Sequence, residues 1–297
     1  MVKQLFIFFL ACTMFAACKS RPKEDLTFPG TEMDPGELKI SAQAMDEIVQ
    51  NISSPIEMAA IIKDLGVPFS AQHLSKLSSE DRYSTSFKMA LSLGILGADL
   101  GYLNVYEKTG ATVNYLSAIN KLADGLRISQ FFDFNTLKRL ATGSTNIDSL
   151  MFLSVHSFNQ MDEHLRNTER NNLSALMITG AWIEGMYFAT QVAKQTNDDF
   201  LSEYIAEQKI TLNNLMLILK NFQNDPDFKN LIAELESIKN TFDKVRITYE
   251  MGEPQAVDKD GMLMIVQQET SVIELSDGVL NNIIEATEKV RNHLLTL

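Results

Sequence analysis

The sequence predicts an all-α protein, an antiparallel helical bundle with an internal pseudo-repeat. From about residue 37 onward, apolar residues recur at the three- and four-residue spacing of amphipathic helices rather than in strict alternation. The 297 residues include seven prolines and fourteen glycines, which leaves little room for a turn-rich all-β design. With 45% hydrophobic residues, the chain can bury a sizeable core. We therefore expect one helical bundle domain over residues 37–250.

The expected helices begin with two short ones, around residues 45–49 and 56–61. Ser54-Pro55 is a start signal for the second, because proline is well tolerated in a first helical turn, and Gly66-Val67-Pro68 ends it. Longer helices follow, separated by breaks such as Asn224-Asp225-Pro226. Their expected ranges are 84–107, 111–125, 130–142, 145–167, 170–196, 198–222 and 227–249.

The segment 251–297 is expected to be irregular at first and then to form a C-terminal helix packed on the bundle. Gly252 and Pro254 stop the preceding helix, and the residues 258–261 read as a turn before an apolar run. A short strand or hairpin is therefore expected near 255–270. Ser276 then offers an N-cap for a last helix that runs to about His293.

Charge and cysteine content exclude several classes of function. The chain has a net charge of −12, which would repel a phosphate backbone, so no nucleic-acid partner is expected. Both cysteines, Cys12 and Cys18, lie in the first eighteen residues. The rest of the chain therefore has no thiol for a disulfide, a zinc cluster or a cysteine nucleophile.

The N-terminal segment 1–17 has the pattern of an export signal. Lys3 supplies a positive start, residues 5–15 form an apolar stretch too short to span a bilayer comfortably, and Ala16-Ala17 precede Cys18. These residues resemble a bacterial lipoprotein signal peptide, which implies that Cys18 is lipidated, with palmitate among the acyl chains. An ordinary cleaved secretory signal is the alternative.

The resemblance also implies a location in the cell envelope. Residues 18–36 read as a lipidated polar tether with no apolar periodicity. An aspartate directly after the lipidated cysteine would resemble an inner-membrane retention signal. Lys19 occupies that position instead, which favours the outer membrane. Lys23-Glu24-Asp25 looks similar to a surface-export signal of Bacteroidetes lipoproteins, so the periplasmic face and the cell surface both stay open. The expected partners are the membrane, through the lipid anchor, and envelope proteins.

An internal pseudo-repeat links two of the long helices. Ala90-Leu91, Asp99 and Tyr102-Leu103 correspond to Ala175-Leu176, Glu184 and Tyr187-Phe188 at one constant offset of 85 residues. The sequences of these two helices resemble those of a group of uncharacterised helical lipoproteins from Bacteroidetes. The resemblance is carried by segments such as Leu-Gly-Ile-Leu-Gly-Ala-Asp-Leu-Gly-Tyr and Gly-Ala-Trp-Ile-Glu-Gly-Met-Tyr. That resemblance supports location and fold and implies no activity.

The candidate site residues are Asp99 and Glu184, with Tyr102 and Tyr187 three residues beyond them. Each carboxylate interrupts an apolar helical stripe, and an unpaired buried carboxylate costs several kcal/mol. Structural contacts to tyrosine, hydroxyl or backbone groups, a ligand-orienting pocket, and metal or acid–base chemistry all remain open. We expect both carboxylates to be buried, each within hydrogen-bond reach of a tyrosine or hydroxyl group.

No catalytic residue, metal site or cofactor is assigned from the sequence. His156 and His164 are eight residues apart rather than the four of a zinc-binding helix, and no nucleophile elbow, P-loop or dinucleotide-binding motif is present. The leading hypothesis is a lipid-anchored, non-enzymatic binding or scaffolding protein of the envelope. The alternative is a small-molecule binding or hydrolytic protein that uses Asp99 and Glu184 in a bundle cavity.

Overall fold

The computed structural model describes residues 55–77, 83–143, 147–196, 198–252, 255–259, 262–266 and 269–297. Within these residues helices predominate, and the strands are confined to one segment between the last two helices, so the predicted all-α class is confirmed. The signal segment 1–17, Cys18, the tether 18–36 and the helix expected at 45–49 lie outside the described residues.

The helices follow one another through short connections. None of those described combines the length and apolarity needed to cross a membrane. They are α2 (Pro55–Asp64), α3 (Ser86–Val105), α4 (Thr109–Gly125), α5 (Phe134–Thr142), α6 (Ile147–Asn167), α7 (Asn171–Ala193), α8 (Asp199–Lys220), α9 (Pro226–Phe242) and α10 (Asp277–Leu294), with a 3-10 turn, η2 (Ser129–Phe131), before α5.

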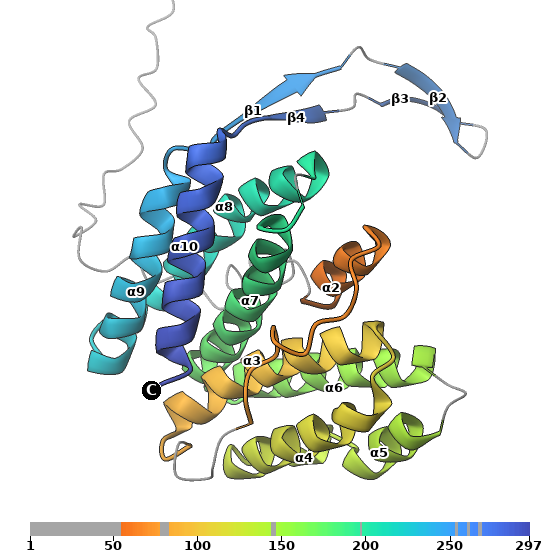
Figure 1. Cartoon of the computed structure of the whole chain (residues 1–297), viewed down its shortest axis with the longest axis vertical. Coiled ribbons are helices and arrows are strands. Elements are labelled where there is room, and N and C mark those ends of the chain that lie inside the picture. Colours follow the sequence, from red (N-terminus) through yellow and green to blue (C-terminus); the bar gives the residue numbers. More distant parts are fainter. Residues whose placement is uncertain are drawn as a thin grey trace, which may run out of the picture. The chain divides into compact units, whose positions relative to one another are not determined.

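Helices α3 and α7, which carry the two halves of the pseudo-repeat, form the centre of the fold (Figure 1). Both are buried on nearly all sides, as expected from helices that are apolar on more than one face. Their backbones touch where Gly94 crosses Gly180: a Cβ atom at Gly94 would lie 1.9 Å from the carbonyl oxygen of Met177. The two helices run in the same general direction through this crossing, because Asp99 and Glu184, which follow Gly94 and Gly180 in the sequence, also interact with each other.

The other helices surround this central pair. Helices α2, α4 and α6 pack against α3, and α5 lies between α4 and α6. Helices α8 and α10 pack against α7, and α9 lies beside both of them. The central pair therefore receives helices from both ends of the described chain, which is what brings distant residues to one site.

Two expected helices differ from those observed. The helix expected at 130–142 is divided into η2 and α5, because Asp133 accepts a hydrogen bond from the backbone N–H of Thr136 and so caps a new helix start. The helix expected at 227–249 ends at Phe242. Residues 245–249 read Val-Arg-Ile-Thr-Tyr, and such a run of β-branched and aromatic residues favours a strand over a helix.

A two-stranded ribbon connects α9 to α10 and is longer than the hairpin expected near 255–270. Strand β1 (Arg246–Met251) pairs with β4 (Glu269–Glu274), and β2 (Gln255–Lys259) pairs with β3 (Met262–Val266), both antiparallel. At its base, Ile247 lies opposite Ile273, and both side chains pack on the edge of the core. The ribbon is thus an insertion between two helices that are themselves neighbours.

Candidate functional site

Asp99 and Glu184 come together at the centre of the fold. Asp99 lies near the middle of α3 and Glu184 near the middle of α7, one to two turns beyond the glycine crossing that brings the two backbones together. Both residues are 0% exposed, and each carboxyl group is near enough to shift the pKa of the other: a hydrogen bond from Asp99 lowers the pKa of Glu184, and the charge of Glu184 raises the pKa of Asp99. The burial expected for the two carboxylates is therefore observed, and they form one site rather than two.

Arg291 supplies the positive charge of this site. It lies in the last turn of α10, is 5% exposed, and binds Glu184 through two parallel hydrogen bonds, from Nε to Oε2 at 2.8 Å and from Nη2 to Oε1 at 2.5 Å. Its guanidinium carbon lies 4.1 Å from the centre of the Tyr187 ring, a cation–π contact. The planar guanidinium is suited to such bidentate and stacked pairing, whereas the ammonium of a lysine is not.

The segment 67–77, which we call the strap, connects α2 towards α3 and covers the site with its backbone. Ser75 donates its backbone N–H to Oδ1 of Asp99 at 3.2 Å, and its hydroxyl group bonds to Oδ2. The hydroxyl of Tyr115, on α4, donates to the carbonyl oxygen of Ser75 at 2.6 Å, and Nη2 of Arg291 donates to that of His73 at 3.2 Å. Side chains from three helices therefore hold the strap in place.

Two tyrosines fasten the beginning of the strap in the same way. The hydroxyl of Tyr106 donates to the carbonyl oxygen of Val67 at 2.7 Å, and the backbone N–H of Ser70 donates to the hydroxyl of Tyr102 at 3.0 Å. Phe69 of the strap stacks on the ring of Tyr102, with 5.4 Å between ring centres. A strap without regular secondary structure thus satisfies its buried backbone groups with side chains.

Burial dominates the electrostatics of the site. It holds the pKa of Asp99 well above its usual range, the charge of Glu184 raises that pKa further, and the hydrogen bonds from Ser75 oppose the rise. Burial also raises the pKa of Glu184, against the opposing effect of Arg291. For His73, burial lowers the pKa and the charge of Arg291 adds to this, which favours a neutral imidazole.

The two tyrosines named from the sequence lie in this region but do not bind the carboxylates. Tyr102 stacks between Phe69 and Phe188 and accepts its hydrogen bond from the strap. Tyr187 lies against Arg291, and its ring meets that of His73 edge to face. A hydroxyl partner is present for Asp99, as expected, in Ser75. Glu184 instead has a guanidinium partner, which the sequence analysis did not anticipate.

The geometry of the cluster favours a structural use of these charges over chemistry on a substrate. Both carboxylates are sealed from solvent, and their hydrogen-bonding partners are groups of the protein itself. Among the described residues, no group of three or more His, Cys, Asp and Glu side chains could hold a metal ion. A ligand could reach Asp99 and Glu184 only after the strap had moved away.

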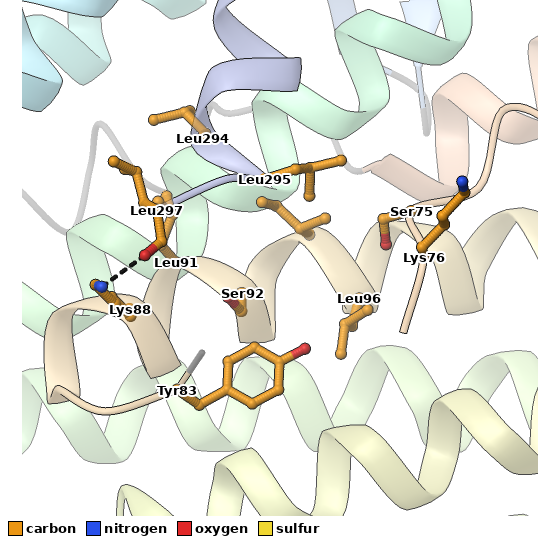
Figure 2. A pocket seen from close by; sticks show the side chains of 11 residues that line it. Ser75, Lys76, Tyr83, Lys88, Leu91, Ser92, Leu96, Leu294, Leu295 and Leu297 are labelled. Atoms are coloured by element: carbon orange, nitrogen blue, oxygen red, sulfur yellow. Dashed lines mark hydrogen bonds between the residues drawn. The ribbon is translucent and has the colours of Figure 1, made fainter. Parts of the chain in front are cut away.

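A small pocket opens beside the strap and shares one residue with the cluster. Figure 2 shows its lining, in which Ser75 and Lys76 of the strap lie on one side and α3 and residues 294–297 supply most of the rest. Lys88, at its edge, donates to the backbone carbonyl oxygen of Leu297 at 2.5 Å. The further lining residues include Tyr83, Leu91, Ser92, Ile95, Leu96 and Leu294. Asp99 and Glu184 are not among them, because Ser75 stands between Asp99 and the pocket.

Sequence reasoning missed Arg291, Ser75, Tyr115 and His73. A signal existed only for Arg291: together with Thr287 it interrupts the apolar stripe that Ile284 and Leu294 continue on α10, and a charge in such a stripe requires a buried partner. Ser75 and His73 lie in a short polar segment that resembles any surface loop. Their contacts are tertiary, and no spacing in the sequence indicates them.

Comparison of the chain with protein-family models, with curated proteins and with solved structures gave no match.

Proposed function

We propose that this chain is a lipid-anchored protein of the bacterial cell envelope that works by binding or scaffolding a partner rather than by catalysis. The anchor is proposed from the sequence alone: an export signal over residues 1–17 is followed at once by Cys18 and then by the polar tether 18–36. With Lys19 after the cysteine, the proposed location is the outer membrane, at its periplasmic face or at the cell surface.

The sealed charge cluster is the observation that supports a non-catalytic role. A catalytic acid or base must lie within hydrogen-bond reach of the group that it serves, and Asp99 and Glu184 are instead bound to Ser75, to Arg291 and to each other. Such a network joins α3, α7, α10 and the strap. Its evident use is to fix how these elements fit together.

Helix α8 offers the surface for a partner. Ile210 and Leu217 lie seven residues apart, on one face of the helix, and are 45% and 48% exposed. Phe200, in the first turn of the same helix, is 58% exposed. Exposed apolar side chains grouped along one helix favour contact with another protein.

The alternative is a small-molecule binding or hydrolytic protein that uses Asp99 and Glu184. The pocket of Figure 2 is the observation in its favour, because Ser75 both lines this pocket and bonds to Asp99. Under this alternative, a ligand entering the pocket would displace Ser75 and gain access to the carboxyl pair.

Membrane fractionation tests the anchor. The parent chain should incorporate labelled palmitate and remain with the envelope fraction after salt and carbonate washes, whereas Cys18→Ala should do neither, because the acyl chains are its proposed membrane attachment. Cys12→Ala is the matched control and should behave like the parent. If Cys18→Ala keeps both the label and the membrane association, the anchor proposal is wrong.

Site-specific crosslinking in intact envelopes tests the binding role. A photoreactive residue at Ile210 or Leu217 should give a discrete crosslinked product, and one at the exposed Leu77, which lies on the strap, serves as the control. Equal labelling from all three positions would contradict a partner on α8. Ligand-dependent acceleration of hydrogen exchange in the strap would favour the alternative, because displacement of Ser75 breaks its backbone hydrogen bond to Asp99.

A further inference from the structure

The buried cluster contains two acids but a single guanidinium. Arg291 directs two parallel N–H groups to Glu184, and in this bidentate ion pair the charge of Glu184 balances that of Arg291. Asp99 receives hydrogen bonds from Ser75 and contacts Glu184, but among the described residues it forms no ion pair of its own. Ionising both acids would therefore leave one net negative charge in a site that is closed to solvent.

Titratable and polar groups from α4, α7, α10 and the strap face the carboxyl pair, and none of them balances this second negative charge. They are Tyr115 from α4, Tyr187 from α7, Arg291 from α10, and His73 and Ser75 from the strap. The tyrosines resist ionisation because burial raises the pKa of each, and the pKa of His73 is lowered by burial and by Arg291. Arg291 is already paired with Glu184.

We propose that Asp99 carries a proton in the folded protein at neutral pH and donates it in a hydrogen bond to the carboxylate of Glu184. The cluster is then electrically neutral, with one anion, one cation and one neutral acid. Two carboxylates in contact commonly hold one proton between them, because the shared proton turns repulsion into a hydrogen bond.

This protonation state also explains how the strap is fastened. Oδ1 of a neutral Asp99 accepts the backbone N–H of Ser75, and the O–H of the acid is directed to Glu184. The strap is therefore bound to a neutral carboxyl group, and the ion pair of Glu184 with Arg291 lies behind it. Loss of the proton would strengthen the hydrogen bonds from Ser75, but it would place two carboxylates side by side beneath the strap with a single guanidinium to balance them.

The two acids should consequently respond in opposite ways to amide substitution. Asp99→Asn mimics the protonated acid: the amide oxygen can accept from Ser75 and the NH2 group can donate to Glu184. Glu184→Gln removes the anion to which Arg291 donates its two parallel hydrogen bonds. This inference does not depend on the proposed function, since it concerns only the folded cluster.

Denaturation of the full-length chain at a series of pH values provides the test. Above about pH 4 an unfolded aspartate has lost its proton while the folded Asp99 keeps it, so the folded state binds more protons and becomes less stable as pH rises. The unfolding equilibrium constant of the parent should rise relative to that of Asp99→Asn by up to tenfold per pH unit until Asp99 itself ionises. At neutral pH, Asp99→Asn should be at least as stable as the parent.

Glu184→Gln and a matched control complete the experiment. Glu184→Gln should raise the unfolding constant at neutral pH by a hundredfold or more. Asp162→Asn is the control, because Asp162 is also buried but forms an ion pair with Arg166, with 2.9 Å between Nε and Oδ2. Asp162→Asn removes the charge from this pair and should therefore destabilise the protein.

Infrared spectroscopy provides an independent readout if Glu184→Gln fails to fold. The carbonyl stretch of a protonated carboxyl group should be present in the parent at neutral pH and absent from Asp99→Asn. An Asp99→Asn variant that is as damaged as Glu184→Gln, or a parent spectrum without this band, would overturn the proposal.

Discussion

Gly94 of α3 and Gly180 of α7 cross with their backbones in contact. A Cβ atom at Gly94 would lie 1.9 Å from the carbonyl oxygen of Met177, and one at Gly180 would lie 2.1 Å from that of Leu91. Because each helix has a glycine where the other needs space, the approach is reciprocal. This crossing sets how closely the two helices approach each other one to two turns before Asp99 and Glu184.

Substitution of either crossing glycine by alanine should be severely destabilising. The added methyl group meets backbone atoms that no rotamer change can move, so Gly94→Ala and Gly180→Ala should each lower the free energy of unfolding by about 3 kcal/mol. Gly278 is the control, since it lies in the first turn of α10 with open space around it. Gly278→Ala should stabilise by about 0.5 kcal/mol in thermal melts. Equal effects at all three positions would contradict the close contact.

Removal of the guanidinium at position 291 should be far more damaging than removal of an exposed one. Arg291→Met leaves Glu184 buried without its cation and should cost about 3 to 5 kcal/mol. Arg246→Met breaks the ion pair between Arg246 and Glu274, whose side chains are 72% and 64% exposed, respectively. This change should lower the free energy of unfolding by less than about 1 kcal/mol. Chemical denaturation of the two variants measures the difference, and similar midpoints would be evidence against a buried ion pair.

Loss of one hydroxyl group on α4 should loosen the strap. Tyr115→Phe removes the donor to the carbonyl oxygen of Ser75, which should cost about 1 to 2 kcal/mol because a buried acceptor is left unpaired. Hydrogen exchange should accelerate in the strap before it does so in α3. Tyr249→Phe, at an exposed position of the ribbon, should change neither quantity. Unaltered exchange in Tyr115→Phe would show that this bond does not hold the strap.

The N-caps of the neighbouring helices α9 and α10 should differ in strength. Asp225 accepts hydrogen bonds from the N–H groups of Asp227 and Phe228, at 2.8 and 3.4 Å, so Asp225→Ala should cost about 1 kcal/mol. Ser276 occupies the N-cap position of α10 without a side-chain hydrogen bond. Ser276→Ala should therefore stay within about 0.5 kcal/mol of the parent in thermal melts. The reverse order would contradict the capping geometry.

The helical part of the fold was predictable because its signals are local. Apolar spacing identifies α3 and α7 as central helices, and Asn224-Asp225-Pro226 marks the start of α9. Prediction failed where two local preferences compete. The apolar spacing of residues 245–249 continues that of the preceding helix, but their β-branched and aromatic residues favour a strand. In the folded chain residues 246–249 belong to β1 and pair with β4.

The candidate site was predictable only in part. The acids Asp99 and Glu184 are visible in the sequence because a charge within an apolar helix is unusual. Their partners are not visible in this way, since Ser75 and Tyr115 reach the site only through the path of the chain in space. Helix periodicity shows that a buried carboxylate needs a partner, but not which of many distant residues provides it.

The position of Arg291 in the sequence has a consequence for the order of folding. Its partner Glu184 is 107 residues away, and the carbonyl group of His73 that it also binds is 218 residues away. During synthesis, α3 and α7 emerge before α10, so Glu184 has no guanidinium partner until α10 has been made. The contacts that close such long loops form late and slowly. A chain interrupted before α10 would therefore leave Glu184 between the two central helices without its guanidinium partner.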